Sequence, residues 1–443
     1  MTPTSNSVLP DIPPVARSAV TAPVRHPARV IVPLSIGNAL EWFDIVMYGY
    51  LAATIAKVFF PAENEYNGLL IVLGTFGASY AMRPIGSILL GAYADKAGRR
   101  KALNLSIRLM LLGTMAIAFA PTYQQAGVTG AVIVVIAKLV QGFSAGGEYG
   151  SSTALLVEQD PQRRGFFGSW QVASQGLTVV LAALFGYFLN VLFSPGQLEG
   201  WAWRIPFIFG LSIGPVAIYI RRHLKEGEEF SAAGTAAPSV AQSLSQNRGR
   251  ILTALGLITL STTTAYTMLY MPTYAMKYLH FPASASFFPT IVMGVLQAVL
   301  APVFGGLSDR YGRARVMVPA ACVLMIGVVP GYLALMQWPT MTTLILVEAF
   351  IGVSMTAYTG PLPAAMAELF PVKLRGLGLS LSYSLGVAVF GGFAPFASQA
   401  LIARTGMVIA PAFVLMLAVV LSAISLVFAC RYGLHNPAKQ STR

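Results

Sequence analysis

Two carboxylates stand three residues apart near the middle of a long apolar stretch. Glu41 and Asp44 belong to the stretch from Ile31 to Phe60. In a helix, residues three apart share one face, so both carboxylates would face the same way. If that helix crosses a membrane, both acids lie at bilayer depth. A charge there costs from about 2.5 to well over 10 kcal/mol, depending on the reference state, so it rarely persists without a function.

Two cations are expected at about the same depth in the membrane as Glu41 and Asp44. Arg83 lies a little past the middle of the second apolar stretch, and Lys138 lies near the middle of the fourth, with Gln141 on the same face. A guanidinium can hold a carboxylate in a bidentate fork, whereas an ammonium acts as a compact charge. We expect these cations to attract an anionic substrate. The alternative is internal pairing with Glu41 and Asp44, which is compatible with function.

A proton needs an acid to carry it, and three acids are candidates. Glu41, Asp44 and Glu148 all stand in apolar stretches, where a desolvated carboxyl can bind and release a proton. Glu148 follows two glycines, so it could instead serve helix packing or pair with a cytoplasmic arginine. Asn38, one turn before Glu41, offers an amide either to substrate or to Glu41.

The C-terminal half is expected to supply hydroxyls rather than charge. Its ionisable residues within apolar stretches, Lys277 and Glu348, are placed near helix ends and away from the midplane. Tyrosines recur every fourth residue at 266, 270 and 274, a spacing that suits either packing or a cavity-lining face. Besides the two cations, the candidate substrate-binding residues are Asn38, Gln141, Gln171, Gln175, Thr263, Thr264, Tyr270, Tyr274 and Tyr358.

The composition is that of a membrane protein. Of 443 residues, 56% are hydrophobic and 10% are charged, against about 25% charged in an average soluble domain. The net charge of +13 does not indicate nucleic acid, because the basic residues stand in short clusters between apolar stretches. Cys322 and Cys430 both lie in apolar segments, so neither a disulfide framework nor a zinc site is expected.

Apolar stretches long enough to cross a bilayer predict an all-α fold of twelve transmembrane helices in two pseudo-symmetric six-helix bundles. The predicted spans are residues 30–59, 67–94, 102–121, 127–157, 166–193, 203–221, 251–278, 284–307, 316–337, 341–367, 376–403 and 408–431. The expected organisation is a disordered tail at 1–28, an N-terminal bundle at 29–221, a linker at 222–250, a C-terminal bundle at 251–432 and a tail at 433–443. No cleavable signal peptide is expected, because the first 28 residues lack an apolar region.

Lysines and arginines gather on one side of the predicted membrane. Clusters at Lys96–Lys101, Arg163–Arg164 and Arg313–Arg315 stand in loops of that side, whereas the opposite loops hold few basic residues, Arg204 and Arg404 being the clearest. The positive-inside rule therefore predicts that both termini and the linker are cytoplasmic.

The two halves repeat one another. Residues 91–100 (GAYADKAGRR) follow the second span, and residues 305–314 (GGLSDRYGRA) follow the eighth. A second pair, at residues 158–165 and 368–376, shares Glu, Pro and Arg-Gly in that order. Two independent matches at corresponding places indicate duplication of a six-helix unit.

The first repeated loop, Gly-x-x-x-Asp-(Arg/Lys)-x-Gly-Arg, resembles the hallmark loop of the major facilitator superfamily. The resemblance implies latches at the cytoplasmic mouth, with Asp95 near the start of the eleventh span and Asp309 near the start of the fifth. The unpaired N–H groups at a helix start stabilise an acid. The alternative is that the loops only set topology through their positive charge. The implied gate residues are Asp95, Arg99, Arg164, Asp309, Arg313 and Arg375.

Other stretches are similar to the metabolite–proton symporter family of that superfamily. They are residues 37–44 (GNALEWFD), 59–61, 82–86 (MRPIG), 141–148 (QGFSAGGE), 203–207 and 390–392. Residues 59–63, 91–93, 142–146, 262–264 and 272–274 resemble the bacterial citrate–proton symporters. Residues 147–150 are shared at least as well with the 2-oxoglutarate branch, and Trp42 stands where the citrate branch is expected to have a polar residue.

The resemblance implies a secondary active transporter of the bacterial cytoplasmic membrane that couples proton entry to uptake of citrate or a related tricarboxylate by alternating access. Other carried substrates remain open, namely 2-oxoglutarate or another dicarboxylate, shikimate, and proline or betaine. A drug–proton antiporter also remains open, although Arg83 and Lys138 argue against it.

Other function classes are disfavoured. No nucleophile–base set or metal cluster indicates an enzyme, so no catalytic residue, metal or cofactor is expected. A channel does not suit duplicated halves around one asymmetric charged site. The expected partners are a small carboxylate anion, protons and the lipid bilayer, without nucleic acid, and the expected state is a monomer.

Overall fold

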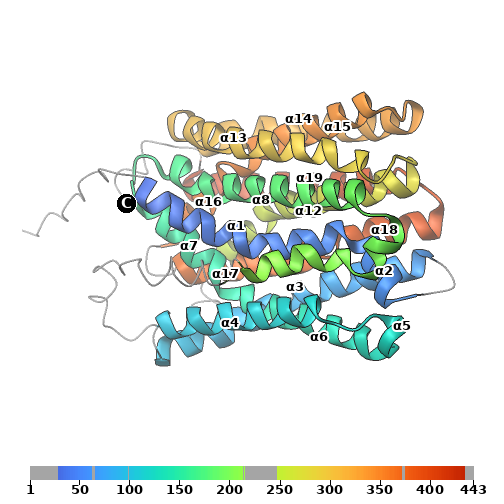
Figure 1. Cartoon of the computed structure of the whole chain (residues 1–443). Coiled ribbons are helices and arrows are strands. Elements are labelled where there is room, and N and C mark those ends of the chain that lie inside the picture. The colour runs from blue at the N-terminus through green and yellow to red at the C-terminus, as the bar shows by residue number, and fades with distance from the viewer. Residues whose placement is uncertain are drawn as a thin grey trace, which may run out of the picture.

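The computed structural model describes residues 28–61, 65–97, 99–212, 214, 247–371 and 375–434. Within these ranges the chain is almost entirely helical, and the long helices run side by side along one direction (Figure 1). Helices α13, α14 and α15 lie along one side of the molecule and α4 and α6 along the other, with α1, α8 and α12 between them (Figure 1). The predicted all-α fold is confirmed.

The N-terminal half supplies the helices of the first six spans. They are α1 (Ala28–Tyr50), α2 (Ala52–Phe59), α3 (Glu65–Ala97), α4 (Arg99–Ala118), α5 (Tyr123–Ala126), α6 (Val128–Ser144), the 3-10 turn η1 (Ala145–Gly147), α7 (Glu148–Glu158), α8 (Arg164–Leu192), α9 (Pro195–Gly200) and the 3-10 turn η2 (Ala202–Arg204). Residues 205–212, the described part of the sixth span, are also helical.

The C-terminal half supplies the other six spans. They are α12 (Arg248–Tyr278), the 3-10 turn η4 (Ala285–Phe287), α13 (Phe288–Tyr311), α14 (Arg313–Gln337), α15 (Met341–Thr359), α16 (Leu362–Leu369), α17 (Arg375–Gly386), the π-helical segment η6 (Val387–Gly391), α18 (Ala394–Thr405), α19 (Ala410–Ala429) and the π-helical segment η7 (Cys430–Leu434). Helix α12 begins slightly before the predicted boundary at residue 251. The predicted N-terminal tail and most of the linker lie outside the described ranges.

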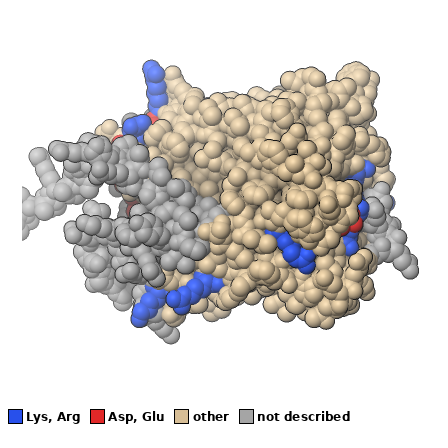
Figure 2. Space-filling model, in the orientation of Figure 1, with Lys and Arg blue, Asp and Glu red and all other residues tan. Residues whose placement is uncertain are grey.

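The helices have the length and composition that a membrane demands. Among the described residues, eight helical stretches are long and apolar enough to cross a bilayer, and a ninth is counted if α1 and α2, bent by 70°, form one span. Residues 104–118 and 128–144 form shorter apolar helices. Charged side chains are few on the face seen in Figure 2, and most lie toward its two ends. An apolar surface of this kind suits a hydrocarbon solvent.

The two halves meet most extensively where α8 packs along α13. Small residues allow this approach, because a Cβ on Gly176 would come within 2.6 Å of the backbone nitrogen of Ala298. Such close contact is how helices associate when the surrounding solvent is as apolar as their side chains. We call the end of the molecule that carries Arg164, Arg313 and Arg375 the basic end.

Two glycines allow α3 and α6 to touch backbone to backbone. A Cβ on Gly86 would overlap the carbonyl of Phe143, and a Cβ on Gly142 would overlap the carbonyl of Ser79. This contact fixes the depth of Arg83 on α3 relative to Lys138 on α6.

We predict that Gly142→Ala lowers the thermal unfolding midpoint of the purified protein in detergent, because overpacking a core typically costs about 1–3 kcal/mol. The matched control is Gly306→Ala, since no heavy atom lies within 4 Å of the Cβ built there. Equal midpoints for the two variants would contradict the close helix contact.

Candidate functional site

A chain of hydrogen bonds links Asp44 to Lys138 inside the N-terminal half. Thr114 of α4 donates to Asp44 Oδ2. Gln141 Nε2 donates to the Thr114 hydroxyl at 2.9 Å, and Lys138 Nζ donates to Gln141 Oε1 at 3.0 Å. Asp44 is 5% exposed and Lys138 is 1% exposed, so the acid and the cation are joined through two neutral side chains away from water.

The second oxygen of Asp44 lies against the sixth span. A Cβ on Gly210 would overlap Asp44 Oδ1, so glycine leaves the space that this oxygen occupies. Asp44 Oδ1 accepts no hydrogen bond from the described residues. A buried carboxylate oxygen without a donor is costly, which makes this atom a natural place for a proton.

Both cations lie over aromatic rings. Lys138 Nζ is 4.5 Å from the centroid of the Tyr48 ring, and the Arg83 guanidinium carbon is 4.5 Å from that of Tyr80. Arg83 is 2% exposed, and it lies close enough to Lys138 for the two charges to interact. The ring faces offset part of the cost of burying the cations.

The aromatic residues connect this charged cluster to the C-terminal half. Tyr266 of α12 stacks on Trp42 with ring centroids 5.9 Å apart, and it meets Tyr80 edge-on at 4.9 Å. Phe76 joins the same cluster, with its ring centroid 5.8 Å from that of Tyr266. The charged residues therefore lie beside the contact between the two bundles, where a movement of one bundle changes their surroundings.

The side-chain amide of Asn38 forms hydrogen bonds with residues of α8 inside the N-terminal bundle. Asn38 Nδ2 donates to the Ser174 hydroxyl at 2.7 Å and to the Gln171 carbonyl at 3.2 Å, and Gln171 Nε2 donates to Asn38 Oδ1 at 2.9 Å. Both residues are buried, whereas Gln175 is half-buried. In this conformation the two predicted substrate ligands, Asn38 and Gln171, tie α1 to α8.

Most of the predicted hydroxyl ligands pack within the C-terminal half. Tyr270 donates to Gln399, Tyr274 to the Val408 carbonyl at 3.0 Å, Tyr358 to the Leu257 carbonyl at 2.8 Å, and Thr263 to the Phe390 carbonyl at 3.3 Å. These contacts match the packing alternative for the tyrosine series. The Thr264 hydroxyl is different, because it is buried without a hydrogen-bond partner among the described residues.

At the basic end, Asp309 joins the halves by capping α8. Its two carboxylate oxygens accept from the backbone N–H groups of Gly165 and Phe166, each at 2.8 Å. Arg313 Nη1 donates to Asp309 Oδ1 at 2.6 Å and thereby fixes the carboxylate. The acid thus lies at the start of the fifth span, as the resemblance implied, and it satisfies donors that a helix start leaves unpaired.

A second contact between the halves lies beside this cap, where Arg375 Nη1 pairs with Glu158 Oε1 at 2.9 Å. Within the C-terminal half, Arg313 Nη2 pairs with Glu368 Oε1 at 2.9 Å. Arg164 is close enough for its charge to interact with both pairs. At the same end the Tyr149 and Tyr383 rings stack with their centroids 3.4 Å apart. The basic end is therefore closed by contacts between α7 or α8 and the C-terminal half.

No contacts can be given for four of the residues that were predicted to belong to the site or the gate. The side chains of Glu41, Asp95, Arg99 and Glu148 lie outside the part of the chain that the structure describes.

Glu348 lies near the start of α15, in keeping with its expected place near a helix end. It is also 0% exposed. The sequence position did not indicate this burial, because the burial depends on neighbouring helices of both halves.

Comparison with known proteins gives the family. The Sugar (and other) transporter model matches residues 30–231, and the Major Facilitator Superfamily model matches residues 288–443. The citrate-proton symporter of Klebsiella pneumoniae is 38% identical over 401 residues, which are 88% of this chain and 90% of that protein. The chain belongs to the major facilitator superfamily.

Other relatives and a solved structure agree with that assignment. The alpha-ketoglutarate permease of Escherichia coli K12 is 33% identical over 87% of this chain and 92% of its own length. The proline/betaine transporter of the same strain is 28% identical over 90% and 82%. A crystal structure of a D-xylose-proton symporter shares the fold, with a TM-score of 0.73 at 17% identity, over 91% of this chain and 97% of that one.

In this multi-pass membrane transporter of the superfamily, further residues that were not expected from the sequence contact the charged cluster or the ion pairs of the basic end. They are Tyr48, Phe76, Tyr80, Thr114, Glu158 and Glu368. The repeated Glu-Pro-Arg pattern could have indicated the two glutamates. A single threonine in an apolar helix gives no such signal.

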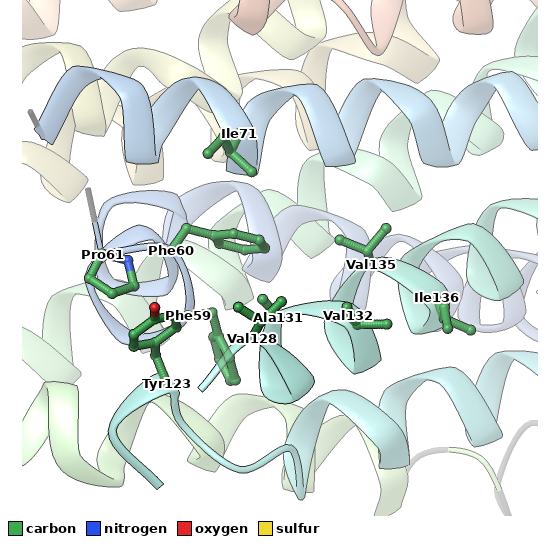
Figure 3. Close-up of a pocket in the computed structure, with 10 residues that line it drawn as sticks. All are labelled: Phe59, Phe60, Pro61, Ile71, Tyr123, Val128, Ala131, Val132, Val135 and Ile136. Carbon is green, nitrogen blue, oxygen red and sulfur yellow. The ribbon is translucent and has the colours of Figure 1, made fainter. Parts of the chain in front are cut away.

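The transporter also has an apolar crevice away from the charged cluster. Its volume is about 370 Å³, and it is lined by Phe59, Phe60, Pro61, Ile71, Tyr123, Val128, Ala131, Val132, Val135 and Ile136 (Figure 3). Several of these side chains, including Ile71 and Val128, are exposed on the outer surface of the helices. The crevice lacks charged groups, so it is not a site for an anionic substrate.

We predict that Thr114→Val lowers transport at least tenfold in this transporter. The substitution keeps the side-chain shape but removes the donor to Asp44 Oδ2 and the acceptor for Gln141 Nε2, at about 1–3 kcal/mol per buried group. Uptake and the thermal midpoint would both be measured.

The matched control is Thr259→Val. Thr259 is equally buried, and its hydroxyl donates only to the carbonyl of Leu255, one turn away in its own helix. Similar losses in both variants would argue against a specific role for the Asp44–Thr114–Gln141–Lys138 chain.

Proposed function

We propose that this protein is a proton-coupled symporter that takes up citrate or a related tricarboxylate. One observation carries the proposal, namely that, among the described side chains, two buried cations, Arg83 and Lys138, lie with the buried acid Asp44 beside the contact between the two halves. Two buried cations beside the contact between the bundles favour a substrate that carries negative charge. The citrate-proton symporters that are 38% identical to the chain support the same substrate class.

Charge balance explains why a proton would accompany the anion. With Asp44 ionised, Arg83, Lys138 and Asp44 sum to one positive charge. A substrate with two or more negative charges would make the enclosed site negative, which is strongly unfavourable at low dielectric. Protonation of Asp44 removes one negative charge. We expect the proton to settle on Asp44 once a substrate carboxylate draws Lys138 away from Gln141.

The movement would be a rocking of the two bundles about the charged cluster. The proposed gate at the basic end comprises Arg164, Asp309, Arg313 and Arg375, together with Asp95 and Arg99 from the first repeat. The cap of Asp309 on α8 and the Glu158–Arg375 pair support this role, because both cross from one half to the other. Breaking the Asp309 cap and the Glu158–Arg375 pair would let the two halves separate at the basic end and open a route for substrate there.

The remaining assignments follow from the same proposal. Substrate ligands would be Arg83, Lys138 and Gln141, with Asn38, Gln171, Gln175, Thr263, Thr264, Tyr270, Tyr274 and Tyr358 exchanging their present contacts for substrate as the bundles move. Glu41 and Glu148 remain further candidates for the proton. The protein would act as a monomer in the inner membrane of a bacterium, with its basic end and both termini in the cytoplasm.

A second candidate substrate is a betaine or proline. Trp42 and Tyr266 are both buried, and their stacked rings are of the type that binds quaternary ammonium groups. The rings of Tyr48 and Tyr80, however, already lie under the protein's own cations. A zwitterion would bring one negative charge to two cations, which favours the tricarboxylate.

We predict that Arg83→Ala reduces uptake of labelled citrate into proteoliposomes with an imposed pH gradient at least tenfold. The control is Arg108→Ala, since Arg108 is an exposed arginine on α4. Excess unlabelled tricarballylate should compete with citrate and excess betaine should not. Competition by betaine alone would replace the tricarboxylate with the zwitterion.

We predict that Asp44→Asn separates exchange from coupling. An amide cannot gain or lose the proton, so uptake driven by the pH gradient should fall at least tenfold, whereas exchange of internal for external citrate should persist. Normal gradient-driven uptake by a folded Asp44→Asn protein would remove Asp44 from the proton pathway.

A further inference from the structure

Glu348 is a buried acid that the proposed coupling does not use. It lies on α15, is 0% exposed, and its Oε2 accepts from the Thr290 hydroxyl of α13 at 3.0 Å. Its other oxygen, Oε1, accepts no hydrogen bond from the described residues, and none of their lysines or arginines pairs with it. One hydrogen bond leaves this carboxyl group far from satisfied.

The groups around Glu348 come from both halves. Among the described residues, the titratable side chains close enough to interact with it electrostatically are Tyr332 of α14 and Tyr50 of α1. The Tyr332 hydroxyl donates a hydrogen bond to Met271 Sδ at 3.4 Å, so its proton does not point at Glu348. Tyr50 belongs to the N-terminal half and packs edge-on against Phe287 of the C-terminal half, with ring centroids 5.5 Å apart.

These residues lie at the end opposite the basic end. Glu348 and Thr290 are near the starts of α15 and α13, whereas Tyr50 and Tyr332 are at or near the ends of α1 and α14. Arg313 at the start of α14 and Asp309 near the end of α13 mark the basic end. In the proposed orientation, Glu348 therefore lies toward the outside.

The surroundings accommodate a neutral carboxyl far better than an ionised one. An ionised carboxylate that is enclosed, without a cation and with a single hydrogen bond, is strongly unfavourable. Tyr50 is part of that enclosure, and it would leave with the N-terminal half if the bundles separated at this end. Water would then reach Glu348 and stabilise its ionised form.

We propose that Glu348 is a second proton-binding site, which must bind a proton before the two bundles can close at the outer end. This inference rests on the proposed proton-coupled transport. It assigns to the C-terminal half a proton-dependent step that is separate from substrate binding near Asp44. The proton would arrive from the outer medium onto a Glu348 oxygen while the outer end is open.

The first test compares Glu348→Gln with the unaltered protein. Glutamine has the shape of the neutral acid and cannot ionise, so closure would no longer require a proton. Citrate exchange in proteoliposomes, with the same pH on both sides, would be measured from acidic to alkaline pH. We expect the ratio of Glu348→Gln exchange to unaltered exchange to rise at least fivefold toward alkaline pH. A ratio independent of pH would overturn the proposal.

The ratio removes the ionisation of citrate and of Asp44, which affect both proteins alike. Thr290→Val is the matched control, because it removes the one hydrogen bond and leaves the acid in place. Its exchange should keep the pH dependence of the unaltered protein. If it instead behaves like Glu348→Gln, the hydrogen bond rather than the proton controls closure, and the proposal fails.

A second measurement covers the case in which Glu348→Gln does not fold. An apolar carbodiimide, which modifies protonated carboxyls in apolar surroundings, would be applied to the unaltered protein, and its attachment at Glu348 would be read by mass spectrometry. We expect a decrease of at least threefold when Tyr50→Ala exposes the site, relative to Tyr123→Ala at an exposed position. Equal modification in both variants would contradict enclosure of a neutral acid.

Failure of this proposal can be told from failure of the proposed function. If the unaltered protein takes up citrate with protons but the exchange ratio is flat, only the role of Glu348 is lost. If the unaltered protein shows no proton-driven uptake, the function itself is wrong.

Discussion

The cost of placing charge inside an apolar bundle governs the arrangement of this protein. Lys138, Arg83 and Asp44 are all nearly inaccessible to water, so each must find a partner within the bundle or be neutralised. Hydrogen bonds through Thr114 and Gln141 and the faces of Tyr48 and Tyr80 provide partial compensation. Because Lys138, Arg83 and an ionised Asp44 sum to one positive charge, binding of an anion and binding of a proton at these three groups affect one another.

The same constraint differs at the two ends of the molecule. At the basic end, Asp309 accepts from N–H groups of α8 and pairs with Arg313, and Glu158 pairs with Arg375, so each acid has a donor from the other half. Toward the other end, Glu348 has one hydroxyl and no cation among the described residues. Opposite ends can therefore respond differently to protons, although the repeat gives both halves the same helical plan.

The fold could be predicted from the sequence because membrane helices are defined by length and apolar composition, which need no knowledge of packing. Asp44, Arg83 and Lys138 could be expected to lie inside the molecule from their positions in those helices, and all three are buried. The partners did not follow, because Thr114 and Gly210 meet Asp44 only through helix packing that a sequence does not state. The burial of Glu348 did not follow for the same reason, because it depends on α13, α14 and α1 rather than on its own helix.

The central claim is that an anion and a proton cross together. It is tested most directly by recording the external pH of lightly buffered, de-energised proteoliposomes while citrate is added. We predict that the medium becomes alkaline as citrate enters, and that the change disappears in Asp44→Asn. Citrate entry without any movement of protons would contradict the account.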